Sequence, residues 1–365
     1  LDSAPGCDGL TYRDLKGLLE DEDRSPDVQK WLMAASRGEL PNYTELATGR
    51  LVGIPKNDKG DLRPICVNSV LYRLVAGMAY MVAIIHDGVA AQACMTQQFA
   101  LHVTDGALKA AQAVRYAYNH LVNLGTGDAV VLNLDCKNAF NTCSRATMLK
   151  NWAALAPLSY RMMAPFYLTH APLWLRGSDG HPYKIYSQAG QRQGDNTGTL
   201  GFCLTVEPTL LRIRRAFQHK SVTIISFADD ITVVGPAPAA LEATHSIREA
   251  LLAECGLTLG AGKCSLHAAP SQIQAVLGAL ESGPAVQDLF DGQPTPLATV
   301  VGCPVSLHPP DSEGARSAVV QHVLQRIHRV TRPDFRVLED LAAFEHPGLA
   351  FQYFDRVLKA QFTFD

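Results

Sequence analysis

The stretch SVTIISFADDITVVG, residues 221–235, decides the fold. Two runs of β-branched and apolar residues flank Ala228, Asp229 and Asp230, and this pattern predicts a β-hairpin with acidic residues at its turn. A second run, AVVLNLD at residues 129–135, also ends in a carboxylate and has the pattern of a buried central strand. Helical patterns fill the chain between the two runs. Together these patterns predict an α+β fold with an antiparallel sheet.

The carboxylates of Asp135, Asp229 and Asp230 would meet at one end of this sheet if the two strands are antiparallel neighbours. Hard cations such as Mg²⁺ take oxygen ligands and leave positions open for substrate phosphates. Two such ions, about 3.5–4 Å apart, stabilise the attacking and leaving oxygens of a phosphoryl transfer. The three carboxylates therefore predict a two-metal site. Taken alone, residues 228–230 favour an acidic turn on a surface hairpin over a metal site.

Further patterns extend this plan on both sides. Residues 50–67 contain two short apolar runs around a basic, Gly-containing turn, which predicts a second hairpin. No repeat with a period between about 20 and 50 residues is present, which excludes solenoids and propellers. Several longer stretches have helical periodicity. They cover residues 69–87, 106–124, 144–167, 198–217, 239–255 and 313–329.

Composition narrows the class of protein. The 365 residues are 47% hydrophobic and 18% charged, which is typical of a folded globular chain and not of a disordered one. The formal net charge of −3 argues against a protein whose whole surface attracts nucleic acid, but it permits a local basic groove. Nine scattered cysteines disfavour a disulfide framework and a zinc module, and they indicate an intracellular setting. The longest apolar stretch is too short for a membrane span.

Seven short motifs follow one another along the chain. They are APGCDGLTY (4–12), IPKNDKGDLRPI (54–65), NLDCKNAFNT (133–142), SQAGQRQGDNTGTLGF (187–202), SFADD (226–230), GLTLGAGKCSL (256–266) and VVGCP (300–304). In this order they resemble the motifs of reverse transcriptases, and the resemblance covers most of residues 1 to about 305. The match to APGCDGLTY and to the run QQFALHVTDGA at residues 97–107 is closer to the non-LTR retrotransposon and group II intron branch than to retroviruses.

The resemblance implies a right-hand polymerase fold. Residues 1–128 would form an N-terminal extension and fingers, with contributions to the palm. Residues 129–305 would form the palm, an antiparallel sheet with helices and with fingers insertions between its strands. Residues 306–365 would form a truncated helical thumb, and residues 300–304 would be a hairpin that holds the primer end. The implied activity is that of an RNA-directed DNA polymerase, a nucleotidyltransferase.

The resemblance also assigns roles around the acidic residues. Asp135, Asp229 and Asp230 would hold two Mg²⁺ ions, for which Mn²⁺ may substitute, and the backbone carbonyl of Cys136 would reach the metal on the nucleotide side. Phe140 lies five residues after Asp135, where family members place an aromatic ring against the sugar C2′ position. A ring there leaves no room for a 2′-hydroxyl and favours deoxynucleotides. A core phenylalanine is the alternative.

Five more residues match positions that bind the nucleotide in the family. Lys56 and Arg63 would contact the triphosphate, and the planar guanidinium of Arg63 suits bidentate phosphate contact. Gln193 and Gly194 would border the sugar and the templating base, because a glycine allows close approach of backbone to ligand. Lys263 would protonate the leaving pyrophosphate. Simpler alternatives are a solvated surface lysine at position 56 and a strand-edge lysine at position 263.

Two other functions compete with polymerisation of deoxynucleotides. A catalytically inactive nucleic-acid scaffold is disfavoured because all three carboxylates are present, and an RNA-dependent RNA polymerase is disfavoured by Phe140. The expected partners are an RNA template, a DNA primer or an RNA–DNA hybrid, and dNTPs. A non-LTR retroelement or a domesticated relative would carry endonuclease and DNA-binding regions outside this chain. The expected location is intracellular, and nuclear for a eukaryotic retroelement.

Overall fold

The computed structural model describes residues 4–55, 62–89, 97–177 and 179–308. In that part of the chain a four-stranded central sheet has the order β6-β7-β3-β8. Its strands are β6 (Thr223–Phe227), β7 (Asp230–Pro236), β3 (Ala129–Asp135) and β8 (Ser265–His267). All the pairings within this sheet are antiparallel, as the sequence predicts for the two acidic runs.

Side chains alternate along each strand between the two faces of the central sheet, and other elements cover both faces. On one face Leu132 and Leu134 pack with helices α10 (Gly198–Phe217) and α11 (Ala237–Cys255). On the other face Val131 packs with α6 (Gly106–Asn123) and with the hairpin of β9 (Leu297–Val300) and β10 (Cys303–Ser306). Burial of each such side chain stabilises the folded state by about 2 kcal/mol. Because both faces are covered, apolar residues occupy successive positions, and each strand appears in the sequence as a largely apolar run.

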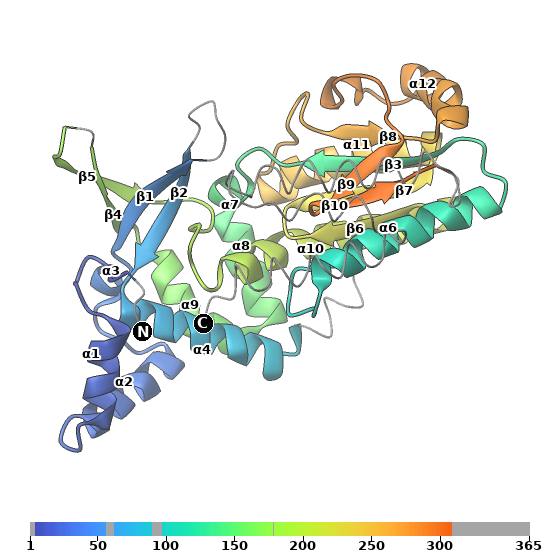
Figure 1. Ribbon diagram of the computed structural model, residues 1–365. Coiled ribbons are helices and arrows are strands. Elements are labelled where there is room, and N and C mark those ends of the chain that lie inside the picture. The colour runs from blue at the N-terminus through green and yellow to red at the C-terminus, as the bar shows by residue number, and fades with distance from the viewer. Residues whose placement is uncertain (1–3, 56–61, 90–96, 178, 309–365) are drawn as a thin grey trace, which may run out of the picture.

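An outer sheet stands apart from the central sheet at the other end of the molecule (Figure 1). In the described residues its order is β2-β1-β4-β5. The predicted hairpin forms β1 (Gly49–Pro55) and β2 (Leu62–Asn68), and β1 then pairs in parallel with β4 (Ala171–Arg176). Strand β4 and its partner β5 (Pro182–Ser187) were not predicted from the sequence. Both lie, in chain order, between β3 and the acidic hairpin of β6 and β7.

Helices join the two sheets. The pattern at residues 144–167 predicts one helix, but the structure has two, α8 (Arg145–Leu155) and α9 (Pro157–Leu168). Pro157 starts the second helix because proline has no N–H for the interior of the first. Asp87 caps α9 by accepting hydrogen bonds from the backbone N–H groups of residues 158 and 159, at 3.1 and 3.0 Å. The remaining helices are α1 (Tyr12–Glu20), α2 (Ser25–Arg37), α3 (Tyr43–Leu46), α4 (Val70–Ile85), α7 (Ala139–Thr142) and α12 (Ile273–Ser282).

The predicted hairpin at residues 300–304 is present as β9 and β10, with Val301 and Gly302 at its turn. The predicted thumb, including the helical pattern at 313–329, falls after residue 308 and so lies outside the described residues. Among the helices that the structure describes, none has the length and apolar character needed to span a bilayer.

Candidate active site

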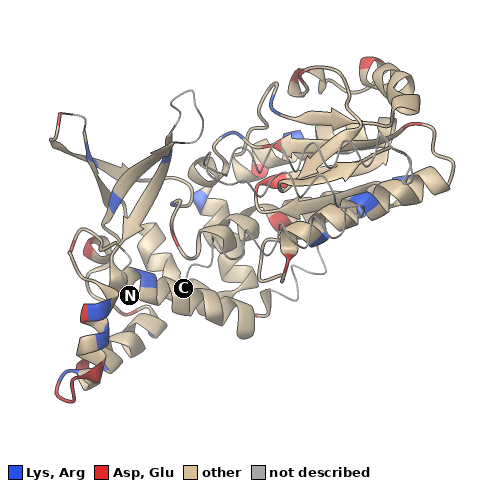
Figure 2. Ribbon diagram, viewed as in Figure 1, with Lys and Arg blue, Asp and Glu red and all other residues tan. Residues whose placement is uncertain are grey.

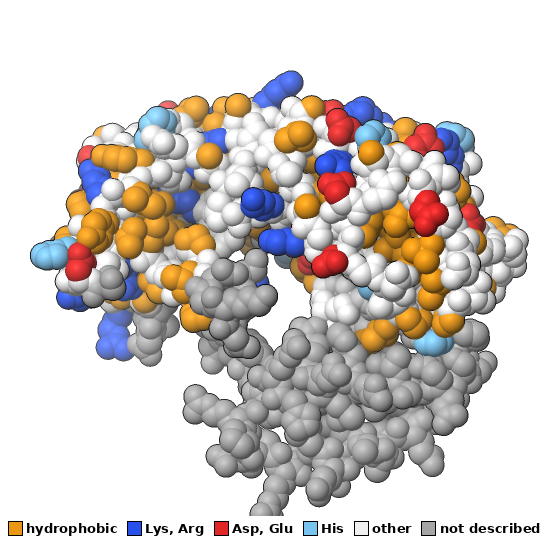
Figure 3. Space-filling view, turned by 90° about the horizontal axis from the view of Figure 1, so that it is seen from above, with side chains coloured by type: hydrophobic (Ala, Val, Ile, Leu, Met, Phe, Trp, Pro, Cys, Tyr) orange, Lys and Arg blue, Asp and Glu red, His pale blue; other side chains and the backbone are white. Residues whose placement is uncertain are grey.

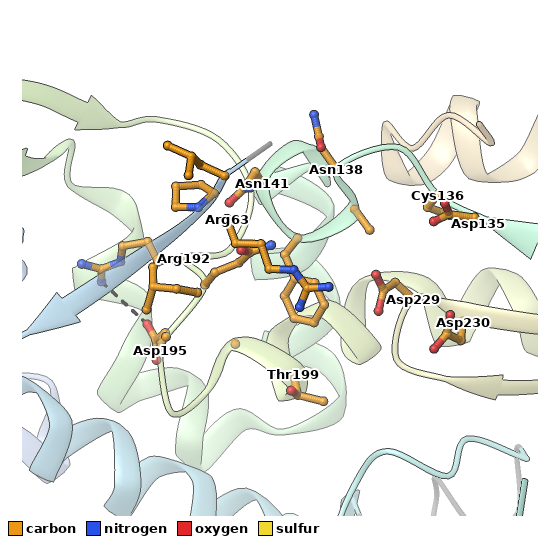
Figure 4. Close-up of a pocket in the computed structure, with 18 residues that line it drawn as sticks. Arg63, Asp135, Cys136, Asn138, Asn141, Arg192, Asp195, Thr199, Asp229 and Asp230 are labelled. Atoms are coloured by element: carbon orange, nitrogen blue, oxygen red, sulfur yellow. Dashed lines mark ion pairs between the residues drawn. The ribbon is translucent and has the colours of Figure 1, made fainter. Parts of the chain in front are cut away.

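The register of the central sheet brings the three acidic residues to one end. Asp135, the last residue of β3, is paired with Asp230, the first residue of β7. Asp229 occupies the two-residue turn between β6 and β7, directly beside them. Figure 4 shows the three carboxylates gathered at the same edge of the pocket. Asp135 and Asp229 are therefore 94 positions apart in the sequence but neighbours in the fold.

The acidic residues affect one another electrostatically. Partial burial, with the nearby charges of Asp229 and Asp135, raises the pKa of Asp230 to about 6. Oxygen donors crowded in this way suit a hard cation, since a cation relieves their mutual repulsion. Within the described ranges, however, no three His, Cys, Asp or Glu side chains are arranged as a ready-made metal site. The donor set fits Mg²⁺, and the remaining ligands would come from water and substrate phosphates.

The raised pKa of Asp230 predicts a pH dependence of stability in EDTA. Between about pH 4 and pH 6 the folded protein holds a proton on Asp230 that the unfolded chain releases. The free energy of unfolding should therefore fall as pH rises through this window. Asp230→Asn removes this contribution and should stabilise the metal-free protein at pH 7 by about 1 kcal/mol, after allowance for solvent screening.

Urea unfolding of the wild type and Asp230→Asn at pH 4.5 and pH 7 measures this difference. The advantage of the variant should grow with pH. An advantage that is equal at both pH values would mean that Asp230 titrates normally in the folded protein.

A pocket of about 680 Å³ lies between the acidic residues and the outer sheet. The described surface is hollowed between the two sheets, with basic side chains at the rim (Figure 3). Arg63, exposed on β2, lines the pocket, and its side chain is directed toward Asp229 (Figure 4). A cation facing carboxylates across a pocket provides the two charges that a triphosphate and its metal ions require.

Phe140 forms the wall of the pocket next to the acidic residues. It lies in α7, the short helix that follows β3, and is half-buried. Its ring stacks on Phe202 of α10, with centroids 4.8 Å apart and an angle of 21° between the planes. Phe202 is 1% exposed, so the stack fixes the Phe140 ring against the core while one side of the ring remains available to the pocket.

The loop before α10 brings Gln193 and Gly194 against β2. The Gln193 carbonyl accepts a 2.7 Å hydrogen bond from the Cys66 N–H. Gly194 has φ of +93°, and a Cβ there would lie 2.6 Å from the Cys66 carbonyl oxygen, so only glycine fits. The side-chain Oε1 of Gln193 is buried and has no hydrogen-bond partner in the described part of the chain. A buried acceptor without a partner is unfavourable, and a rotation of the side chain toward the pocket would expose it to a donor.

A buried network fastens the same loop from behind. Arg192, 5% exposed, donates to the hydroxyl of Tyr72 at 2.7 Å and lies 3.8 Å from the Asp195 carboxylate (Figure 4). The hydroxyls of Tyr72 and Tyr167 both contact Asp195 Oδ2. Arg192 also donates to the Ala47 carbonyl, at 2.7 Å, just before β1. The network therefore ties the pocket loop to α4, α9 and the outer sheet.

Most of the site residues predicted from the sequence line this one pocket. Asp135, Asp229, Asp230, Cys136, Arg63, Phe140, Gln193 and Gly194 all do so. Lys263 is exposed in a turn before β8, not on a strand edge, and is not among the lining residues. Lys56 lies outside the described residues. The sequence analysis missed other lining residues, which lie inside its own motifs: Asn138, Asn141, Arg192, Asp195 and Thr199.

Comparison with known proteins identifies the family. The model described as "Reverse transcriptase (RNA-dependent DNA polymerase)" matches residues 54–280, which include the pocket and all three acidic residues. No curated protein matches the sequence.

Two solved structures of telomerase have a similar fold. Telomerase from Candida albicans, in complex with a TWJ fragment of telomeric RNA, aligns with a TM-score of 0.51 and 13% identity over 92% of this chain. The corresponding complex from Candida tropicalis aligns with a TM-score of 0.50 and 11% identity over 88% of this chain. The alignments span 58% and 56% of those chains, a little over half of their length. The likeness confirms the right-hand polymerase fold, and, with the family match over more than half of its residues, this chain belongs to the reverse transcriptase family.

Proposed function

We propose that this chain is an RNA-directed DNA polymerase, in which a primer 3′-hydroxyl attacks the α-phosphate of a dNTP paired with an RNA template and pyrophosphate leaves. The pairing of Asp135 with Asp230 at the end of the central sheet, with Asp229 beside them and Arg63 across the pocket, carries the proposal. Membership of the reverse transcriptase family supports it.

The acidic residues and Arg63 would have separate tasks in this reaction. Asp135 and Asp229 would hold two divalent ions, with Asp230 and the Cys136 carbonyl beside them. Bound there, the metal pair would neutralise the charge of the attacking and leaving oxygens. Arg63 would neutralise the triphosphate from the other side of the pocket, so that catalysis consists mainly of positioning and charge stabilisation.

The loop at residues 193–194 and the outer sheet would bind the base pair being formed. Rotation of the Gln193 side chain toward the pocket would let its unpartnered Oε1 accept a hydrogen bond from the nucleotide, while the close contact of Gly194 with β2 would hold the loop against the outer sheet. Template bases would pair with the nucleotide rather than with the protein, so the enzyme would bind the hybrid by shape and backbone charge. Basic side chains of the outer sheet (Figure 2) support such binding.

The motifs at residues 4–12 and 97–107 favour the non-LTR retrotransposon and group II intron branch, or a domesticated relative of it. In such a protein we expect DNA-binding or endonuclease regions outside this chain and location in the nucleus of a eukaryotic host.

Primer extension by the purified chain tests the proposal. A poly(rA)/oligo(dT) hybrid is supplied with Mg²⁺ or Mn²⁺ and with dTTP or UTP in parallel. Extension with dTTP alone is expected. Extension with UTP would indicate an RNA polymerase, and binding of the hybrid without extension would indicate a scaffold.

The Phe140 ring is expected to exclude ribonucleotides. Phe140→Val opens space next to the sugar, and we expect it to raise the use of UTP relative to dTTP by about 100-fold in kcat/KM. Phe290→Val is a matched control, because Phe290 is also half-buried against the core but does not line the pocket. If both variants fold and discriminate as the wild type does, Phe140 is a core residue and not a steric gate.

A further inference from the structure

A buried polar cluster lies directly behind the turn that carries Asp229. Its members are Gln98, Ser226, Glu207 and Arg214, and we refer to them as the turn cluster. Gln98 and Ser226 are both 0% exposed and Glu207 is 9% exposed. Polar groups at such depth destabilise a protein unless they are hydrogen-bonded, and the members of the turn cluster bond to one another and to the backbone of the turn.

The hydrogen bonds of the turn cluster fix the orientation of the Gln98 amide. Gln98 Nε2 donates to Glu207 Oε1 at 3.0 Å, and a carboxylate can only accept. The other end of the amide, Oε1, is thereby directed to the backbone and accepts from the Ala228 N–H at 2.9 Å. If the amide were flipped, its oxygen would face the carboxylate and its NH₂ would face a backbone donor, and both contacts would be lost.

Arg214 holds Glu207 in place. Its Nη1 donates to Glu207 Oε2 at 2.7 Å and its Nη2 to Ser226 Oγ at 2.7 Å. Both charged side chains lie on α10, seven residues apart, and they are only 10% and 12% exposed. The ion pair therefore supplies a fixed acceptor for Gln98, which lies 109 residues earlier in the chain.

The backbone that Gln98 contacts is in an unfavourable conformation. Ala228 has φ of +53°, a region that residues other than glycine rarely adopt. Such a conformation persists only where surrounding contacts determine it, and it is common at functional sites. The bond to Gln98 orients the peptide group just before Ala228, one residue from the metal-binding candidate Asp229. The residues that flank this two-residue turn, Phe227 of β6 and Asp230 of β7, pair with each other and close the hairpin.

We propose that Gln98 is a positioning residue, which holds the Ala228 turn so that the Asp229 carboxylate is placed for metal binding, and that Glu207 acts through Gln98 by fixing its amide. This role rests on the proposed function, because it assigns Asp229 to a metal ion. Gln98 itself would touch neither metal nor substrate.

Gln98→Met tests the role, because methionine has similar length, but its thioether is only a weak acceptor for the Ala228 N–H and cannot donate to Glu207. The matched control is Gln272→Met. Gln272 is also buried, and it bonds to the Tyr118 hydroxyl and the Thr126 carbonyl, both at 2.9 Å, near the C-terminal end of α6, whereas this turn lies near the first residue of α6, Gly106. Three quantities are measured for each variant: melting temperature, Mn²⁺ binding by calorimetry without nucleotide or nucleic acid, and kcat and KM for dTTP.

We expect both variants to lose similar thermal stability. Gln98→Met alone should bind Mn²⁺ about 10- to 100-fold more weakly and lose kcat by a similar factor, with little change in KM. Equal Mn²⁺ binding and equal kcat in the two variants would overturn the proposal. A wild type that neither binds Mn²⁺ nor extends a primer would instead overturn the proposed function, and this inference with it.

Glu207→Gln provides a second test, and its first measurement, on the single variant, does not need Gln98→Met to be stable. The neutral amide no longer fixes which way Gln98 faces, so Mn²⁺ binding should weaken. If Glu207 acts through Gln98, the double variant should bind Mn²⁺ no more weakly than Gln98→Met alone. Two results would contradict the proposal that Glu207 acts through Gln98. One is Mn²⁺ affinity in the double variant that falls by the product of the two single losses, and the other is unchanged Mn²⁺ affinity in Glu207→Gln.

Discussion

Asp229→Asn should lower the rate of primer extension by about 10³-fold or more while the protein remains folded. The substitution keeps the size of the side chain and removes its charge, so one ligand of both proposed metal ions is weakened. Single-turnover extension on the RNA template, in Mg²⁺ and then in Mn²⁺, measures the loss. Circular dichroism and melting temperature report whether the fold is intact.

The matched control for this variant is Asp27→Asn. Asp27 is an exposed acid on α2, and its side chain pairs with Lys30, also exposed, at 3.4 Å, an interaction worth little free energy. We expect wild-type extension from this control. Extension by Asp229→Asn at more than a tenth of the wild-type rate would show that Asp229 does not bind a metal needed for the reaction.

Arg192→Met should lower the free energy of unfolding by about 3–5 kcal/mol. The change removes the cation from the buried network behind the pocket and leaves the Asp195 carboxylate, whose side chain is 0% exposed, without its charged partner. Three further acceptors, the Ala47 carbonyl, Asn68 Oδ1 and the Tyr72 hydroxyl, lose a donor. Urea unfolding at pH 7 measures the difference.

Arg248→Met is the matched control for the buried network. Arg248 pairs with Asp288 at 2.7 Å, but the two side chains are 33% and 51% exposed, so the loss should be below about 1 kcal/mol. Asp195→Asn added to Arg192→Met should recover part of the lost stability, because the unpaired buried charge is gone. If Arg192→Met costs no more than the control, the network does not hold the pocket loop.

The half of the fold that carries the three acidic residues could be predicted from the sequence because its signals are local. Strand β3 and the hairpin of β6 and β7 are buried on both faces, so β3 appears as a largely apolar run that ends in Asp135, and the hairpin appears as two such runs that meet at Asp229 and Asp230. Antiparallel pairing then leaves only one place for Asp135 to meet residues 229–230. The family motifs added Arg63 and Phe140, which line the same pocket.

The parts that the sequence did not predict depend on distant contacts or on weak patterns. Strand β5 is exposed along nearly all of its length, so it shows no alternation of apolar and polar residues. Arg192 looks like a surface cation in the sequence, and only its approach to Tyr72, 120 residues away, makes it a buried one. Gln98 likewise acquires its role from contacts with residues more than 100 positions later.

Mn²⁺ anomalous diffraction from crystals of the chain with an RNA template, a DNA primer and a non-hydrolysable dNTP analogue tests the central claim most directly. We predict two peaks about 3.5–4 Å apart. They should lie between the phosphates of the analogue and the carboxylates of Asp135 and Asp229, with Arg63 on the opposite side of the triphosphate. A bound analogue with no Mn²⁺ at these carboxylates, or with its phosphates outside the pocket, would contradict it.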